Sequence, residues 1–138
     1  MLLHFKTYCN TDNLKLIRDF LRKSLSDNGV SDPDAHLTVL AVDEICSNLM
    51  IHSNACNSQM EINLDLAFFH NQLQITITDS GLSFNYTEHQ DISVESLIYE
   101  KRKGGLGLML VKRIMDEVSY ETQSGRNCWI LSKKWKAA

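Results

Sequence analysis

The segment from Val39 to Ile51, VLAVDEICSNLMI, constrains the fold most, because it is mostly apolar and too long for one strand. It predicts a buried helix, which we expect to run from about Asp34 to Ser53. The polar residues Glu44, Asn48 and His52 recur at a spacing of four, so they share one face of that helix. Burying a carboxylate and an amide costs several kcal/mol without partners. This stripe must therefore face solvent, a polar network or a ligand cavity.

The chemistry of the stripe is compatible with a metal site. The carboxylate of Glu44 and the amide oxygen of Asn48 suit a hard cation such as Mg²⁺, which binds oxygen ligands and keeps several waters. A carboxylate beside such a site can also act as a general base. A solvent-facing stripe explains the same spacing, and the helix alone leaves both interpretations open.

The flanking segments predict a small α/β domain. An amphipathic pattern begins at Thr11 or Asp12, either of which can cap a helix that ends near Ser26, with Gly29 as the residue after its C-cap. A second amphipathic pattern predicts a helix from Leu106 to about Glu117. Alternating or β-branched segments predict five strands, with a hairpin at residues 70–72. These strands are Leu2–Tyr8, Met60–Phe69, Leu73–Asp79, Val118–Thr122 and Asn127–Lys134.

A cluster of glycines precedes the third predicted helix. The N-terminus of a helix exposes backbone N–H groups and carries a partial positive charge, and glycine lets an anion approach that backbone closely. No GK[ST] follows and no apolar strand leads in, which excludes a Walker A loop and a dinucleotide fingerprint. The cluster therefore indicates either a phosphate seat or a flexible loop beside a solvated basic run. Its residues are Lys103, Gly104, Gly105, Leu106 and Gly107.

The predicted strand from Leu73 ends in Asp79-Ser80-Gly81. An acid at a strand end can accept a hydrogen bond from a ligand amine, and Gly81 would let a flat ligand surface approach. Taken alone, the same residues are equally compatible with a plain turn.

The three pieces occur in an informative order: Glu44-x3-Asn48 on a helix, Asp79-x-Gly81 at a strand end, and Gly105-x-Gly107 before a helix. This order resembles the N-box and the two glycine boxes of the GHKL ATPase superfamily. The segments AVDEICSNLMIHSN and GGLGLMLVKRIMDEVSY are most similar to the small bacterial anti-sigma factor kinases. The resemblance covers nearly the whole chain and implies one histidine-kinase-like ATP-binding domain over residues 1–138. It also implies the Bergerat fold, an α+β two-layer sandwich with helices on one face of a mixed, mostly antiparallel sheet.

The resemblance further implies a role for each matched residue. Asn48 would ligate Mg²⁺, Glu44 would activate the attacking hydroxyl, Asp79 would accept from the adenine amine, and Gly81 would lie beside the base. Residues 84–103 would form a lid over ATP. The phosphates would be held by the glycine loop, namely Lys103, Gly104, Gly105, Leu106 and Gly107.

The chain departs from the family pattern before its last strand. Family members often carry Gly-Thr there, with the threonine touching the nucleotide, whereas this chain has Gly125-Arg126-Asn127-Cys128. The match of Arg102 or Lys103 to a basic lid residue near the γ-phosphate is loose.

The resemblance favours an ATP- and Mg²⁺-dependent serine/threonine kinase that binds a sigma factor and phosphorylates a STAS-domain antagonist. Two alternatives are a non-catalytic, nucleotide-gated binding module and a stand-alone histidine-kinase catalytic domain. The histidine-kinase alternative is disfavoured, because such a kinase needs a phosphoacceptor histidine on a pair of dimerisation helices. The first predicted helix has no histidine, and no coiled-coil heptads precede the domain. An α/β protein without a ligand is the remaining alternative.

Composition limits the partners and the location. The net charge of −3 argues against a general nucleic-acid binder, and no run of apolar residues is long enough to span a membrane. The four cysteines lack metal spacing and indicate reduced, partly buried thiols. We expect a bacterial cytoplasmic protein and, from the resemblance, a homodimer. Trp129 is expected in the core.

Overall fold

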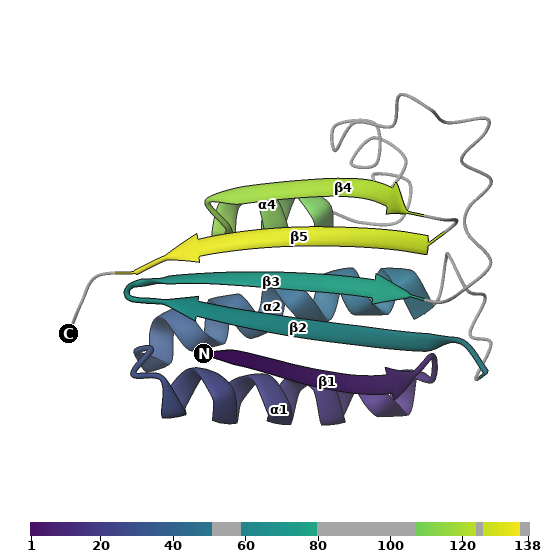
Figure 1. The fold of residues 1–138 in the computed structure, drawn as a ribbon, viewed down its shortest axis with the longest axis horizontal. Coiled ribbons are helices and arrows are strands. Elements are labelled where there is room, and N and C mark those ends of the chain that lie inside the picture. The colour runs from purple at the N-terminus through teal and green to yellow at the C-terminus, as the bar shows by residue number, and fades with distance from the viewer. Residues whose placement is uncertain (51–58, 80–106, 124–125, 136–138) are drawn as a thin grey trace.

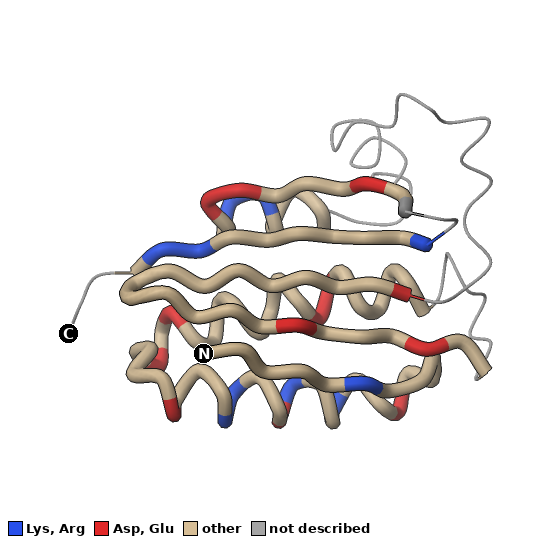
Figure 2. The backbone as a smooth tube through the Cα atoms, in the orientation of Figure 1, with Lys and Arg blue, Asp and Glu red and all other residues tan. Residues whose placement is uncertain are grey.

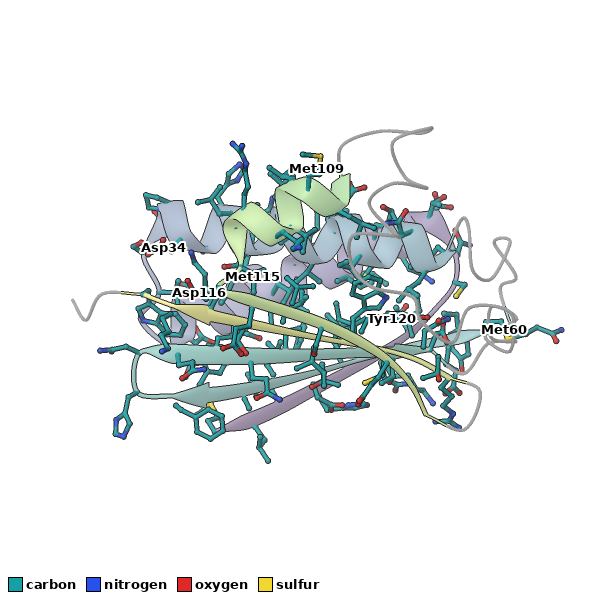
Figure 3. The ribbon with its side chains drawn as sticks, turned by 90° about the horizontal axis from the view of Figure 1, so that it is seen from above. Asp34, Met60, Met109, Met115, Asp116 and Tyr120 are labelled. Carbon is teal, nitrogen blue, oxygen red and sulfur yellow. The ribbon has the colours of Figure 1, made fainter. Side chains whose placement is uncertain are left out.

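The computed structural model describes residues 1–50, 59–79, 107–123 and 126–135. Within these residues the chain forms two layers, a sheet and a set of helices that cover one of its faces (Figures 1 and 3). The described helices are α1 (Leu14–Asp27), α2 (Asp32–Asn48) and α4 (Gly107–Ile114). The predicted α+β two-layer architecture is confirmed.

The described strands form a five-stranded sheet in the order β1-β2-β3-β5-β4. All four pairings are antiparallel, so the mixed character that the resemblance implied is not seen among these strands. Alternate residues of β2 and β3 are buried beneath the helices, and the register brings such residues opposite each other. The strands are β1 (Leu2–Tyr8), β2 (Glu61–Phe69), β3 (Gln72–Asp79), β4 (Glu117–Gln123) and β5 (Arg126–Lys134).

The first helical segment consists of two parts, a short 3-10 turn followed by an α-helix. A short 3-10 turn, η1 (Thr11–Asn13), precedes α1, and the Asn10 side chain accepts from the backbone N–H of Asp12 at 2.9 Å. The prediction that Thr11 or Asp12 is the cap is therefore wrong, because the chain is already helical at both. The other end is as predicted: Gly29 has φ +79°, and the N–H of Val30 reaches back to the Leu25 carbonyl at 3.0 Å.

Helix α1 carries both acidic and basic residues (Figure 2), and Arg22 pairs with Asp19 and Lys23 with Asp27 on the surface. The opposite face of α1 is apolar and includes the fully buried side chains of Ile17 and Leu21. The apolar face packs this helix into the core, and the charged face stays in contact with water.

Helix α2 starts two residues earlier than predicted, because the Ser31 side chain accepts from the N–H of Asp34 and Pro33 fits the first turn. The chain continues past Asn48 as a wider helical turn at residues 49–50. The last predicted residues of this helix, 51–53, lie outside the described part. Six of its residues are buried, as its apolar sequence predicted.

Helix α4 ends at Ile114, three residues before the predicted end. The N–H of Asp116 already bonds to the Ser132 carbonyl at 2.8 Å, so sheet pairing replaces the last helical turn. Lys133 donates to the Ile114 carbonyl at 2.9 Å and thus satisfies a carbonyl that the ended helix leaves unpaired. Figure 3 shows Met115 directed towards the sheet and Met109 on the outer side of α4.

The core lies between the helices and the sheet, and Trp129 belongs to it as predicted, at 5% exposure. Cys9, Cys46 and Cys128 are buried and are not part of disulfide bonds. Among the described residues, no helix is long and apolar enough to cross a membrane.

Candidate functional site

Three segments that are distant in sequence each have one end on the same side of the molecule. In Figure 1 the C-terminal end of α2, the C-terminal end of β3 and the N-terminal end of α4 all lie on that side. Glu44 and Asn48 occupy the last turns of α2, and both are half-buried. Ser47 donates to the Glu44 carbonyl at 3.1 Å within the same turn. The predicted polar stripe thus lies at the end of the molecule where the other two motifs meet.

Gly107 lies directly against Glu44. A Cβ added at Gly107 would overlap the Glu44 carboxylate and come within 2.6 Å of its Cγ. Helix α4 begins at this glycine, so the Glu44 side chain lies against the start of α4. The structure therefore brings together the helix motif and the last residue of the glycine loop, and any side chain at position 107 would require the Glu44 carboxylate to move.

Asp79, at the end of β3, is completely buried. Its Oδ1 accepts from the backbone N–H of Asn127 at 3.2 Å, and its Oδ2 accepts from the Asn127 side-chain Nδ2 at 2.7 Å. Asn127 is itself 1% exposed. Because a buried carboxylate is tolerated only with donors around it, these bonds explain how the acid stays at this position.

A tyrosine on the edge strand completes this network. The hydroxyl of Tyr120 donates to Oδ1 of Asn127. The Tyr120 ring packs edge-on against Trp129, with 4.5 Å between centroids and 60° between planes. The backbone register explains the cluster, since Tyr120 is opposite Trp129 on β4 and β5, and Trp129 is opposite Ile77 on β3.

Asn127 and Tyr120 were not singled out as site residues from the sequence. From the sequence, Asn127 was considered only within the segment that departs from Gly-Thr, and Tyr120 only as a residue of the predicted strand Val118–Thr122. The available signal was alternation along the last strand, which places a polar residue on the same face as Trp129. Strand order was needed to show that Asp79 is its neighbour.

Several predicted site residues lie outside the described part of the chain. They are Gly81, Lys103, Gly104, Gly105, Leu106, His52 and the lid at residues 84–103. Of the predicted set, the described structure contains Glu44, Asn48, Asp79 and Gly107, and it places Gly107 in contact with Glu44.

A family model for the histidine kinase-like ATPase domain matches residues 9–133. The chain belongs to this family, as the order of its motifs indicated. Use of ATP follows from that membership.

Curated relatives refine this assignment. The chain is 33% identical over 121 residues to serine-protein kinase RsbW of Staphylococcus epidermidis, covering 84% of the chain and 76% of the relative. It is 30% identical over 128 residues to serine-protein kinase RsbW of Bacillus licheniformis, covering 89% and 80%. These relatives confirm the resemblance to the anti-sigma factor kinases and the predicted enzyme class, a protein serine/threonine kinase.

Two solved structures share the fold. One contains the RsbU and RsbW domains of a Mycobacterium tuberculosis protein, with a TM-score of 0.69 and 18% identity, covering 97% of this chain and 32% of that one. The other is the SiaB-SiaC complex of Pseudomonas aeruginosa, with a TM-score of 0.63 and 16% identity, covering 95% and 88%.

Proposed function

We propose that this protein is an ATP- and Mg²⁺-dependent kinase of the anti-sigma type. It transfers phosphate to a serine or threonine of a small STAS-domain antagonist, and it binds a sigma factor when that antagonist does not compete. The observation that carries the proposal is the contact between Gly107 and Glu44, taken together with relatives that are serine-protein kinases.

The described residues fit a bound nucleotide at two points and a bound metal at a third. The first is Gly107, where the absence of a Cβ keeps the start of α4 against an acid. The second is Asp79, a buried carboxylate at a strand end, which suits the amine of a purine. Glu44 and Asn48 supply a carboxylate and an amide oxygen one helical turn apart, which are ligand types that Mg²⁺ accepts.

In this proposal each residue has a separate task. Bound Mg²⁺-ATP supplies the γ-phosphoryl group. Asn48 would hold the metal, Asp79 would accept a hydrogen bond from the adenine amine, and the N–H groups at the start of α4 would bind phosphate oxygens. Glu44 takes the proton of the attacking hydroxyl, so that the seryl oxygen bonds to phosphorus as the bond to ADP breaks. Such reactions depend mainly on positioning and charge stabilisation, and these are the tasks that the proposal assigns to these residues.

The proposed partners are proteins. One of the neighbouring folds was solved as the complex of SiaB with SiaC. We extend this to a STAS-domain antagonist and a sigma factor for this chain, acting as a homodimer in the bacterial cytoplasm. Sedimentation of the purified chain, alone and with each partner, tests the assembly.

Label transfer from γ-labelled ATP tests the kinase proposal. The chain is incubated with Mg²⁺ and a STAS-domain protein from the same genome, and Glu44→Gln is compared with Glu117→Gln, an exposed control on β4. We expect Glu44→Gln to reduce transfer at least a hundredfold and Glu117→Gln to leave it unchanged. ATP binding without any transfer by the wild-type chain would instead favour the nucleotide-gated binding module.

A further inference from the structure

We propose that Asn127, held by Tyr120, is the positioning residue that orients Asp79 for an adenine amine and thereby sets the preference for adenine over 6-keto purines. This inference rests on the proposed function, in which Asp79 contacts the base. It concerns the residue that follows Gly125-Arg126, the pair that stands where family members often carry Gly-Thr.

The first step is the double contact between the two side chains. Asn127 donates to one carboxylate oxygen of Asp79 from its backbone, at 3.2 Å, and to the other from its side chain, at 2.7 Å. Two bonds from one residue to both oxygens fix the plane of the carboxylate as well as its position. With this plane fixed, the remaining acceptor directions of Asp79 are fixed as well.

The second step is the orientation of the Asn127 amide. A carboxylate only accepts, so the NH₂ end of the amide must face Asp79 and its oxygen must face away. The Tyr120 hydroxyl donates to that oxygen, which matches this orientation and opposes the flipped one. Packing of Tyr120 against Trp129 holds the hydroxyl in place.

The third step concerns the ligand. An acceptor with a fixed direction favours a purine that carries an amine at position 6. A purine with a keto oxygen there would set acceptor against acceptor, and a buried polar group left unpaired is costly. The hydroxyl of Tyr120 thus donates to the amide of Asn127, and that amide donates to Asp79. The chain of donors ends at the Asp79 carboxylate, which would accept the base amine from its other side.

The test compares ATP with inosine triphosphate, which differs at position 6, by calorimetric titration with Mg²⁺. The variants are Asn127→Leu and Tyr120→Phe, with Asn127→Thr as the conservative change that keeps a donor. Asn63→Leu is the matched control, because Asn63 lies on β2 opposite Thr78, on the sheet face away from Asp79.

We expect the wild-type chain to prefer ATP. Asn127→Leu should weaken ATP binding about tenfold, equivalent to about 1.4 kcal/mol, while binding of inosine triphosphate changes little. Tyr120→Phe should reduce the ATP preference about threefold. Asn127→Thr should recover part of the preference, and Asn63→Leu should leave both affinities unchanged.

The selectivity ratio separates positioning from structural support. Equal weakening of both nucleotides in Asn127→Leu, or an unchanged ratio in a folded Tyr120→Phe, would overturn the inference while leaving the kinase proposal in place. Failure of the wild-type chain to bind ATP would overturn both. If Asn127→Leu does not fold, as shown by circular dichroism, the ratio in Tyr120→Phe decides.

Discussion

Gly107 and Glu44 are in such close contact that a methyl group on the glycine would occupy the position of the acid's carboxylate. The two residues are far apart in sequence and belong to α4 and α2, which pack side by side. Since the obstructing atoms are the end of a flexible side chain, a larger residue at position 107 would displace the carboxylate rather than unfold the protein.

Gly107→Ala should therefore separate activity from stability. The obstruction is relieved by rotating the end of the Glu44 side chain, and alanine is no worse than glycine within a helix, so the free energy of unfolding should change by less than about 1 kcal/mol. Phosphate transfer should fall at least tenfold, because Glu44 is moved. Transfer assays and urea unfolding on the same preparation check both. Unchanged transfer would show that the position of Glu44 is not critical.

Asn48→Ala should remove the metal dependence of ATP binding. In the wild-type chain, chelation of Mg²⁺ with EDTA should weaken ATP binding, because the proposed ligand holds the metal against the phosphates. In the variant, affinities with and without Mg²⁺ should converge. Calorimetric titration measures both. Retention of the full Mg²⁺ effect would contradict the assignment of Asn48 as the metal ligand.

Gly29→Ala should lower the free energy of unfolding by about 1 to 2 kcal/mol. A Cβ at Gly29 meets nothing within 4 Å, so the cost is only that of φ +79°. Gly29→Asn is the matched control and should cost less, because asparagine tolerates this conformation. Urea unfolding of the three proteins gives the ranking. Equal costs for alanine and asparagine would argue against backbone strain as the cause.

Stability should fall at alkaline pH through Cys46. Burial raises the pKa of the Cys46 thiol above its ordinary value of 9.0, and Asp43 and Cys9 raise it further. Above pH 9 the unfolded chain ionises this thiol while the folded chain keeps it neutral. The stabilisation is thus complete below pH 9 and decreases by about 1.4 kcal/mol per pH unit above it.

The measurement is the free energy of unfolding in urea from pH 7 to pH 10.5, for the wild-type chain and Cys46→Ala. The variant should be less stable at pH 7 because a buried side chain is truncated. Its stability should nevertheless fall less steeply above pH 9. Burial also raises the pKa of Cys128, so some slope should remain in the variant. Parallel curves would rule out Cys46 as the source.

Much of the fold could be predicted from local patterns. The strand Leu2–Tyr8, the C-terminal role of Gly29 and the buried character of α2 depend on residues close in sequence. The wrong cap at Thr11 or Asp12 was a local error, since Asn10 two residues away caps the turn. The misplaced end of α4 has a different cause, a distant contact that competes with local preference. Helix α4 stops at Ile114 because Asp116 pairs with Ser132, a residue of another strand. No local pattern contains that bond.

The features of the candidate site also fall into two groups, those set by local sequence and those set by distant contacts. The sequence by itself determined that Glu44 and Asn48 share a helix face, that Asp79 ends a strand and that a glycine precedes α4, because each depends only on helical or strand periodicity. Only the tertiary structure decided that Gly107 touches Glu44 and that Asn127 and Tyr120 support Asp79. The physical reason is that strand order and helix packing, which set these contacts, arise from burial of the whole core rather than from any one segment.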